Sequence, residues 1–158
     1  MSRRLAVGVG KGRQGGPDFN AEGDRTIPYL QLDVPNHYPV EVKRGLARRL
    51  GDNYARIMQT TPDLVTVAVR ELGEGGVWCC SAGEPEPAAL LSCDIRRGRP
   101  PEQRAELAQA LIDACVETLG LRGDRLAVEF TQHTSDEMYR PGRGWGAEWA
   151  PDEATGAT

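Results

Sequence analysis

The sequence predicts an α/β protein of the α+β type, in which two tandem β-α-β units form a four-stranded sheet with two helices on one face. The main observation is an internal repeat, because residues 28–69 align with residues 89–130 without a gap. The identities include Asp33 with Asp94, Pro39 with Pro100, and Leu46 with Leu107. In addition, each repeat has strand-like residues, then a helical period, then strand-like residues again.

The first unit is expected to span residues 28–72. Its opening strand is "YLQLDV" at 29–34, where apolar and polar residues alternate. Pro39 suits the first turn of a helix. Apolar residues then recur at helical spacing, at Leu46, Leu50, Tyr54, Ile57 and Met58. Pro62 and Asp63 end the helix, and the β-branched run "LVTVAV" at 64–69 predicts the closing strand.

The second unit is expected to span residues 89–133. The segment "ALLSCDI" at 89–95 predicts a strand and "RRGR" at 96–99 a turn. The next helix has its apolar face at Leu107, Leu111, Cys115 and Leu119, and it ends at Gly120. The segment "RLAVEF" at 125–130 predicts the last strand. A helical crossover between two strands of one sheet implies parallel pairing and a right-handed connection.

The remaining segments are expected to connect or flank these units. Residues 1–27 are Gly-rich and polar and predict a flexible leader, and residues 73–88 predict a linker with a short hairpin around 77–80. Residues 134–149 form a C-terminal extension of the domain, and residues 150–158 a disordered tail. With both helices on one face, the other sheet face lacks a cover. Both strand faces carry apolar residues, so the uncovered face predicts oligomerisation.

Composition excludes several classes of function. The net charge of −4 gives no reason to expect nucleic-acid binding. No apolar run is long enough to span a membrane, and the N-terminus lacks a signal-peptide core, so we expect a cytoplasmic protein. The cysteines, Cys79, Cys80, Cys93 and Cys115, lack the paired spacing of a metal site and predict buried or half-buried free thiols. No cofactor is expected.

Pro28, which opens the first repeat, and the turn Arg96-Arg97-Gly98-Arg99, which follows the first strand of the second, carry a resemblance to a known family. The chain resembles the tautomerase superfamily, whose repeating unit is a β-α-β segment that starts at an amino-terminal proline. It looks most like the long, two-unit members related to cis-3-chloroacrylic acid dehalogenase. The resemblance covers residues 28 to 149, and it implies a homotrimer.

The resemblance also implies a site. A free prolyl amine in an apolar, cation-rich pocket has a lowered pKa and can transfer protons beside a carbonyl. Arg96 and Arg99 flank Gly98 and would clamp the carboxylate of a small substrate. Unit two begins with Ala89 where unit one has Pro28, so each chain has at most one proline site.

Several positions depart from the dehalogenase-like pattern of histidine, tyrosine and glutamate. Those positions fall on Tyr54, Glu129 and Arg140. Tyr54 and Glu129 are candidate catalytic residues, although Tyr54 also suits core packing and Glu129 an exposed strand face. Arg140 cannot replace a glutamate that positions water. It is a candidate substrate-binding residue instead.

His133, Trp145 and Trp149 are further aromatic or titratable residues of the C-terminal region. His133 is placed just past the last strand and is a weaker candidate. Trp145 and Trp149 are expected to cover a pocket or a subunit seam.

The residue before Pro28 is Ile27, which makes the proline nitrogen a tertiary amide without a basic lone pair. Three interpretations remain: translation starts at residue 27, the leader is removed, or the proline chemistry has been lost. The main hypothesis is keto-enol tautomerisation of a small 2-oxo or unsaturated carboxylate. The alternatives are hydration, dehalogenation or decarboxylation of a related acid, and a non-catalytic trimer that binds a small anion.

Overall fold

The two β-α-β units are present in the computed structural model, which describes residues 28–142 and 144–145. Unit one comprises β1 (Tyr29–Val34), α1 (Val40–Met58) and β2 (Thr66–Glu71). Unit two comprises β5 (Ala89–Arg96), α2 (Pro101–Leu119) and β6 (Leu126–His133). The short hairpins pair β3 (Trp78–Cys79) with β4 (Glu86–Pro87) and β7 (Tyr139–Arg140) with β8 (Gly144–Trp145). Single 3-10 turns are η1 (Pro62–Leu64), η2 (Gly123–Arg125) and η3 (Ser135–Glu137).

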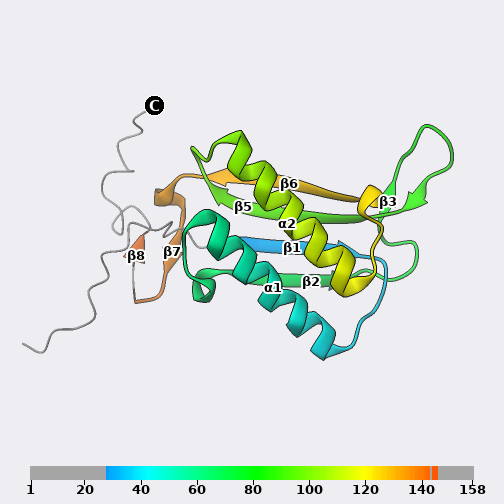
Figure 1. Ribbon diagram of the computed structural model, residues 1–158, viewed down its shortest axis with the longest axis horizontal. Coiled ribbons are helices and arrows are strands. Elements are labelled where there is room, and N and C mark those ends of the chain that lie inside the picture. The colour runs from blue at the N-terminus through cyan, green and yellow to red at the C-terminus, as the bar shows by residue number, and fades with distance from the viewer. Residues whose placement is uncertain (1–27, 143, 146–158) are drawn as a thin grey trace, which may run out of the picture.

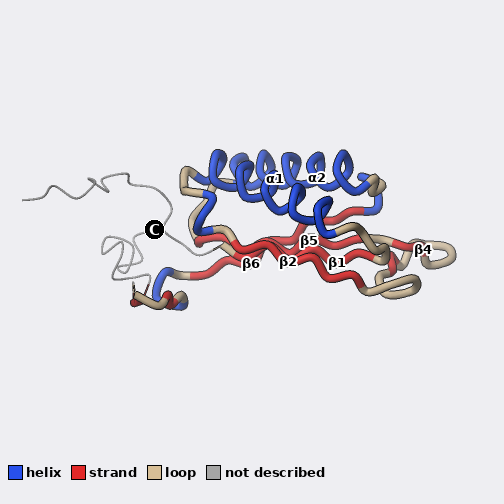
Figure 2. The backbone as a smooth tube through the Cα atoms, turned by 90° about the horizontal axis from the view of Figure 1, so that it is seen from below, coloured by secondary structure: helices blue, strands red, loops and turns tan. Residues whose placement is uncertain are grey.

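The four long strands form one sheet in the order β2-β1-β5-β6. Strands of the same unit pair in parallel, as predicted, whereas β1 and β5 are antiparallel. Both helices cover the same face of the sheet (Figure 2). Because the two central strands run in opposite directions, β1 starts at the end of the sheet where β5 and β6 finish, on the left in Figure 1. This end of the sheet is called the site edge.

The helix boundaries follow from local sequence. Proline occupies the N-cap of α1 at Pro39 and of α2 at Pro100, where its fixed φ and missing N–H are tolerated. At the other end of α2, Gly120 has φ 69°, a left-handed conformation that favours glycine and ends the helix as predicted. In the described part of the chain, no helix is both long and apolar enough to cross a membrane.

The start of α1 is tied to the sheet by Glu71, the last residue of β2. Its carboxylate accepts a hydrogen bond from the Tyr38 backbone N–H at 2.6 Å and pairs with the Lys43 ammonium. The Lys43 hydrogen bond, with the Tyr38 N–H next in importance, lowers the pKa of Glu71 below its usual value. This contact fixes the loop between β1 and α1.

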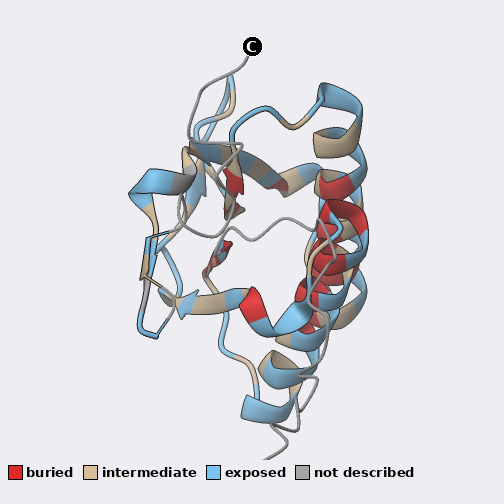
Figure 3. Cartoon of the chain, turned by 90° about the vertical axis from the view of Figure 1, so that its left-hand side faces the viewer, coloured by how far each residue is buried: buried red, intermediate tan, exposed pale blue. Residues whose placement is uncertain are grey.

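The core lies between the helix layer and the sheet, where the buried residues gather in Figure 3. Alternate residues of β1 and β5 enter it, namely Leu30, Leu32, Val34, Ala89, Leu91, Cys93 and Ile95. The helices contribute the apolar faces predicted from the sequence, including Leu46, Leu50, Tyr54, Leu107 and Leu111. Burying one leucine side chain stabilises the fold by about 1.5–3 kcal/mol, so this layer holds the two units together.

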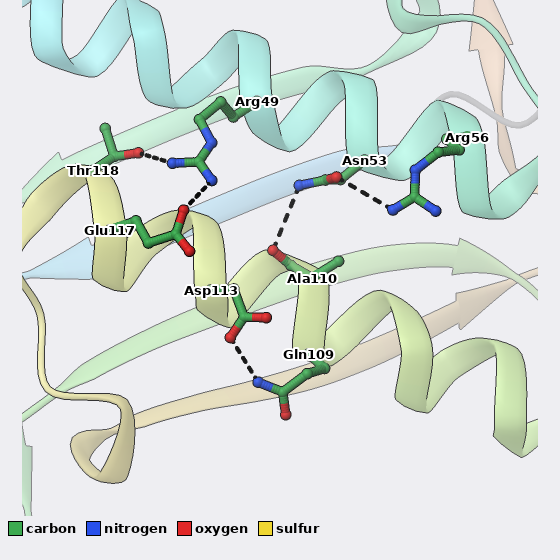
Figure 4. Close-up of polar contacts among 8 residues, drawn as sticks. All are labelled: Arg49, Asn53, Arg56, Gln109, Ala110, Asp113, Glu117 and Thr118. Atoms are coloured by element: carbon green, nitrogen blue, oxygen red, sulfur yellow. Dashed lines mark hydrogen bonds and ion pairs between the residues drawn. The ribbon is translucent and has the colours of Figure 1, made fainter.

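The two helices are antiparallel and also meet through polar side chains along their exposed seam (Figure 4). Arg49 of α1 pairs with Glu117 at 2.5 Å and donates to Thr118 at 3.0 Å. Asn53 donates to the Ala110 carbonyl at 3.5 Å. Exposed ion pairs contribute little stability, so the apolar layer beneath them determines how the helices pack.

The face of the sheet opposite the helices carries mostly polar side chains, with apolar ones such as Leu90 among them. Arg70 forms a bidentate pair with Asp33 across β2 and β1, with both distances 2.6 Å. Ser92 donates to Glu129 across β5 and β6 at 2.7 Å. Cross-strand polar pairs satisfy this face without an apolar cover. Its exposure alone therefore does not require oligomerisation.

The cysteines differ in their surroundings. Cys93 and Cys115 are buried free thiols, and burial raises the pKa of both, that of Cys115 to about 12. Cys79 is half-buried, whereas Cys80 is exposed. The prediction of buried or half-buried thiols is thus right for three and wrong for Cys80, which directly follows the short strand β3.

Candidate active site at the start of β1

Pro28 lies at the site edge, where β1 begins and β5 ends. Leu30 pairs with Cys93 in the antiparallel register of β1 and β5. Continuing that register places Pro28 opposite Ile95 and Tyr29 opposite Asp94. The Pro28 ring is fully buried, and its carbonyl accepts a hydrogen bond from the Thr66 N–H at 3.0 Å. Pro28 is thus fixed between β2 and β5, in surroundings that disfavour a charged amine.

Arg96 and Arg99 also lie at the site edge. Arg96 is the last residue of β5 and is half-buried on the face opposite the helices. Gly98 has φ 94°, a left-handed conformation that turns the chain sharply before α2. Arg99, also half-buried, immediately precedes the N-cap of α2. The Arg97 N–H donates to the His133 carbonyl at 2.9 Å, which anchors the turn to β6. The fold therefore brings this arginine turn and Pro28 to one end of the sheet.

Tyr54 supports the site edge from the helix side. Its side chain is fully buried, and its hydroxyl donates to the Asp94 backbone carbonyl at 3.4 Å. This position fits core packing beneath the end of β5. The hydroxyl holds the β5 backbone that leads into Arg96.

We expect Tyr54→Phe to reduce the free energy of unfolding by about 1 kcal/mol, because the aromatic ring stays while one buried hydrogen bond is lost. Urea denaturation measures this difference. Tyr38→Phe is the matched control, because among the described residues the Tyr38 hydroxyl accepts one exposed hydrogen bond, from Asn36 at 3.3 Å. An unchanged stability for Tyr54→Phe would show that the hydroxyl does not support β5.

Glu129 lies away from Pro28. It is exposed on the open face of β6 and accepts a hydrogen bond from Ser92 at 2.7 Å. Gln132, not Glu129, pairs with Ile95, the residue opposite Pro28. Three residues of extended strand separate these positions by about 10 Å. Within this chain, Glu129 therefore contacts the sheet rather than the proline.

The C-terminal hairpin lies near the site edge (Figure 1). Arg140 belongs to β7 and pairs with Gly144 of β8 through the backbone. Its side chain and Trp149 lie outside what the structure describes. Trp145 packs edge-to-face on Tyr139 with ring centroids 5.2 Å apart, and both rings are about half exposed. This pair is an apolar surface beside the site.

His133 has a larger set of polar contacts than the sequence indicated. It is the last residue of β6, not a residue beyond it, and it pairs with Arg96 of β5. Its Nε2 lies 3.6 Å from Asp94 Oδ1 and its Nδ1 lies 3.4 Å from Glu137 Oε2. Sequence reasoning missed this cluster because its members come from three elements. Asp94, which repeats Asp33, was the one available signal.

The described residues contain no group of three or more His, Cys, Asp or Glu side chains that could hold a metal ion. The chemical groups that the site edge does offer are a buried proline, two half-buried guanidinium groups and a histidine between carboxylates. This set suits the binding of a small anion and the transfer of protons next to it.

Comparison with known proteins gives matches at the level of structure. No protein-family model matches the chain, and no curated protein matches it. Among solved structures, Pt0534 inactivated by 2-oxo-3-pentynoate is 25% identical with a TM-score of 0.66, and the match covers 77% of this chain and 98% of that one. A symmetric trimer of fused 4-OT, Q0, is 23% identical with a TM-score of 0.66, covering 80% and 98%.

A third similar structure is N1, a member of the cis-3-chloroacrylic acid dehalogenase family. It is 19% identical with a TM-score of 0.65, and the match covers 80% of this chain and 91% of that one. Together with the tandem β-α-β units, these matches show that the chain has the fold of the tautomerase superfamily.

Proposed function

We propose that this protein is a tautomerase acting on a small 2-oxo or unsaturated carboxylate, with Pro28 as the proton-transferring group. The observation that carries this proposal is the position of Pro28 at the start of β1, buried at the site edge, where the Arg96–Arg99 turn ends β5. The similarity to Pt0534, which is inactivated by a 2-oxo acid, supports the substrate class.

The chemistry requires a free Pro28 nitrogen. When Pro28 is the first residue, its secondary amine can accept the hydroxyl proton of an enol and then deliver that proton to the adjacent vinyl carbon, which leaves the ketone and the free amine. Burial and the nearby guanidinium groups lower the pKa of such an amine toward neutrality, because both disfavour its protonated form. Arg96 and Arg99 would bind the carboxylate of the substrate and stabilise the enolate next to it.

The test is ketonisation of phenylenolpyruvate by a protein that begins at Pro28, made by removal of the initiator methionine from a Met-Pro start. A rate above that of buffer alone, saturable in substrate, supports the proposal. If this protein binds the substrate but does not accelerate ketonisation, the tautomerase proposal is wrong.

A non-catalytic anion-binding protein is the second candidate, and the observation in its favour is Ile27. In the 158-residue chain, this residue acylates the Pro28 nitrogen and removes its basicity. The arginine turn would then bind a small anion without chemistry. N-terminal sequencing of the natural protein distinguishes the two candidates, because only a mature chain that begins at Pro28 has the free amine.

We further expect the protein to form a homotrimer. Strands β2 and β6 are the two outermost strands of the sheet, each with one side unpaired. Outermost strands left unpaired tend to associate with other chains. The fused 4-OT structure with the same fold is a symmetric trimer. Light scattering should therefore give the mass of three chains, and a monomer at micromolar concentration would contradict this expectation.

A further inference from the structure

His133 lies at the same end of the sheet as the arginine turn. On β5 and β6, Asp94 and Arg96 alternate with the buried Cys93 and Ile95, and Arg96 pairs with His133. The side chains of Asp94, Arg96 and His133 therefore share the face opposite the helices. About a third of the His133 side chain is exposed, so a ligand can reach the imidazole from solvent.

The two carboxylates beside His133 are held differently. Asp94, which faces Nε2, is 25% exposed, and its backbone carbonyl is fixed by Tyr54. Glu137, which faces Nδ1, is 56% exposed and lies in η3, where its carboxylate also accepts a hydrogen bond from the Thr134 N–H at 3.2 Å. An ion pair this exposed is weak. Asp94 is therefore the less exposed neighbour of the ring, whereas Glu137 is the one that an incoming anion can displace from Nδ1.

We propose that protonated His133 is a third cationic ligand of the anion site at Arg96 and Arg99, and that Glu137 is an internal carboxylate that the bound anion displaces. In the free protein, Glu137 occupies the position that a ligand carboxylate oxygen takes when it accepts the Nδ1–H. This inference rests on the proposed carboxylate clamp, but not on a free Pro28 amine.

The proposal predicts a pH dependence with a definite sign. The charged or titratable groups around His133 are Asp94 and Arg96 on β5, Arg97 in the following turn, Asp136 and Glu137 in η3, and Tyr139 on β7. An anion that accepts a hydrogen bond from the protonated His133 ring should bind more tightly at lower pH, because it then gains a charge-assisted partner.

The experiment is calorimetric titration of the 158-residue protein with oxalate, which has the carboxylate and adjacent carbonyl oxygens of a 2-oxo acid. For wild type, we expect affinity to rise by up to about tenfold per pH unit as His133 becomes protonated. His133→Gln should lose this dependence and bind at low pH as weakly as wild type binds at high pH. Glu137→Gln should bind more tightly than wild type near neutral pH, because the competing charge is gone while an acceptor for Thr134 remains.

The matched control is His37→Gln. His37 also lies beside a carboxylate, with Nδ1 3.6 Å from Glu71, but it precedes α1 at the opposite end of β1 and is mostly exposed. This variant should behave like wild type. Thermal unfolding of each variant verifies that it is folded, and His133→Asn provides a second substitution if His133→Gln is unstable.

The two variants are expected to change oxalate affinity in opposite directions, weaker for His133→Gln and tighter for Glu137→Gln. If both residues were purely structural, both substitutions would weaken binding. Wild-type affinity and pH dependence in His133→Gln would overturn the proposal, as would weaker binding in Glu137→Gln or no oxalate binding to wild type. Failure of the tautomerase activity leaves this binding pattern unaffected, so the two proposals can fail separately.

Discussion

A protein that begins at Pro28 is expected to ketonise phenylenolpyruvate about 10²–10⁴-fold faster than the 158-residue chain, the range typical of general acid–base catalysis. In the long chain the Pro28 nitrogen belongs to an amide, whose lone pair is delocalised and not basic. The fold around the proline should be the same, because Pro28 is buried and its carbonyl is bound by Thr66 in β2. The difference in rate between the two proteins therefore measures the contribution of the free Pro28 amine. Ultraviolet absorbance of the enol follows the reaction.

Pro28→Ala in the protein that begins at this residue is the control. It retains an amino-terminal amine, now primary and without the ring that fills the buried position, so its rate should fall between the other two. Equal rates for the short and the long chain would show that Pro28 only opens β1. Any catalysis would then come from other residues.

Arg99→Ala is expected to weaken the binding of a carboxylate substrate or inhibitor by about 1.5–3 kcal/mol, the contribution of a hydrogen bond to a charged group. This corresponds to roughly a tenfold to hundredfold increase in Kd. Arg96→Ala should act similarly. The double variant should lose less than the sum of the two, because residues that bind one ligand are coupled. Calorimetry with oxalate measures all three.

Arg97→Ala is the matched control for these variants. Arg97 belongs to the same turn but is exposed, whereas Arg96 and Arg99 are half-buried. Its substitution removes the same charge from the same segment and should change Kd little. If Arg96→Ala and Arg99→Ala bind as wild type does, or if all three variants weaken binding equally, the turn contributes only long-range attraction and no clamp exists.

The internal repeat predicted most of the fold. Its periodicity indicates which segments are strands and helices, and its β-α-β order indicates which strands pair in parallel. Strand β1 has the predicted ends, because the alternation of apolar and polar residues over 29–34 is a signal within the strand itself. Helix α2 ends before Gly120 as predicted, because that glycine terminates the helix locally. Strands β2 and β6 are displaced toward the C-terminus relative to the prediction. The 3-10 turn η1 takes up Leu64, and pairing continues as far as the partner strand reaches, to Val34 for β2 and to Arg96 for β6. A partner's length is not visible in the strand's own sequence.

The candidate site was predictable where residues lie next to turns and strand ends. Pro28 and the Arg96–Arg99 turn come to the site edge because the two units pair in opposite directions. The surroundings of Glu129 and His133 depend on the register between β5 and β6, which fixes Glu129 beside Ser92 and His133 beside Arg96. Register is set by the assembled sheet, so the sequence could not assign these neighbours.

The neighbours of residues on the open face of the sheet could not be assigned from the sequence either. Both strand faces carry apolar residues, as expected, but on the open face Leu90 lies between Asp33 of β1 and Ala127 of β6, with Ser92 next along its own strand. The polar pair of Asp33 with Arg70 is formed between strands that the chain joins only through α1. Pairs of this kind require the folded sheet.

The most direct test of the account is the site of covalent reaction with 2-oxo-3-pentynoate, measured by intact mass and peptide mapping. This 2-oxo acid has an electrophilic triple bond conjugated to its carbonyl, to which a free amine can add. Cys79→Ser and Cys80→Ser should be introduced first, since Cys80 is an exposed thiol. We predict one adduct per chain, on Pro28, in the protein that begins there, and none on Pro28 in the 158-residue chain. An unmodified Pro28 in the short protein, with adducts elsewhere or absent, would contradict the account.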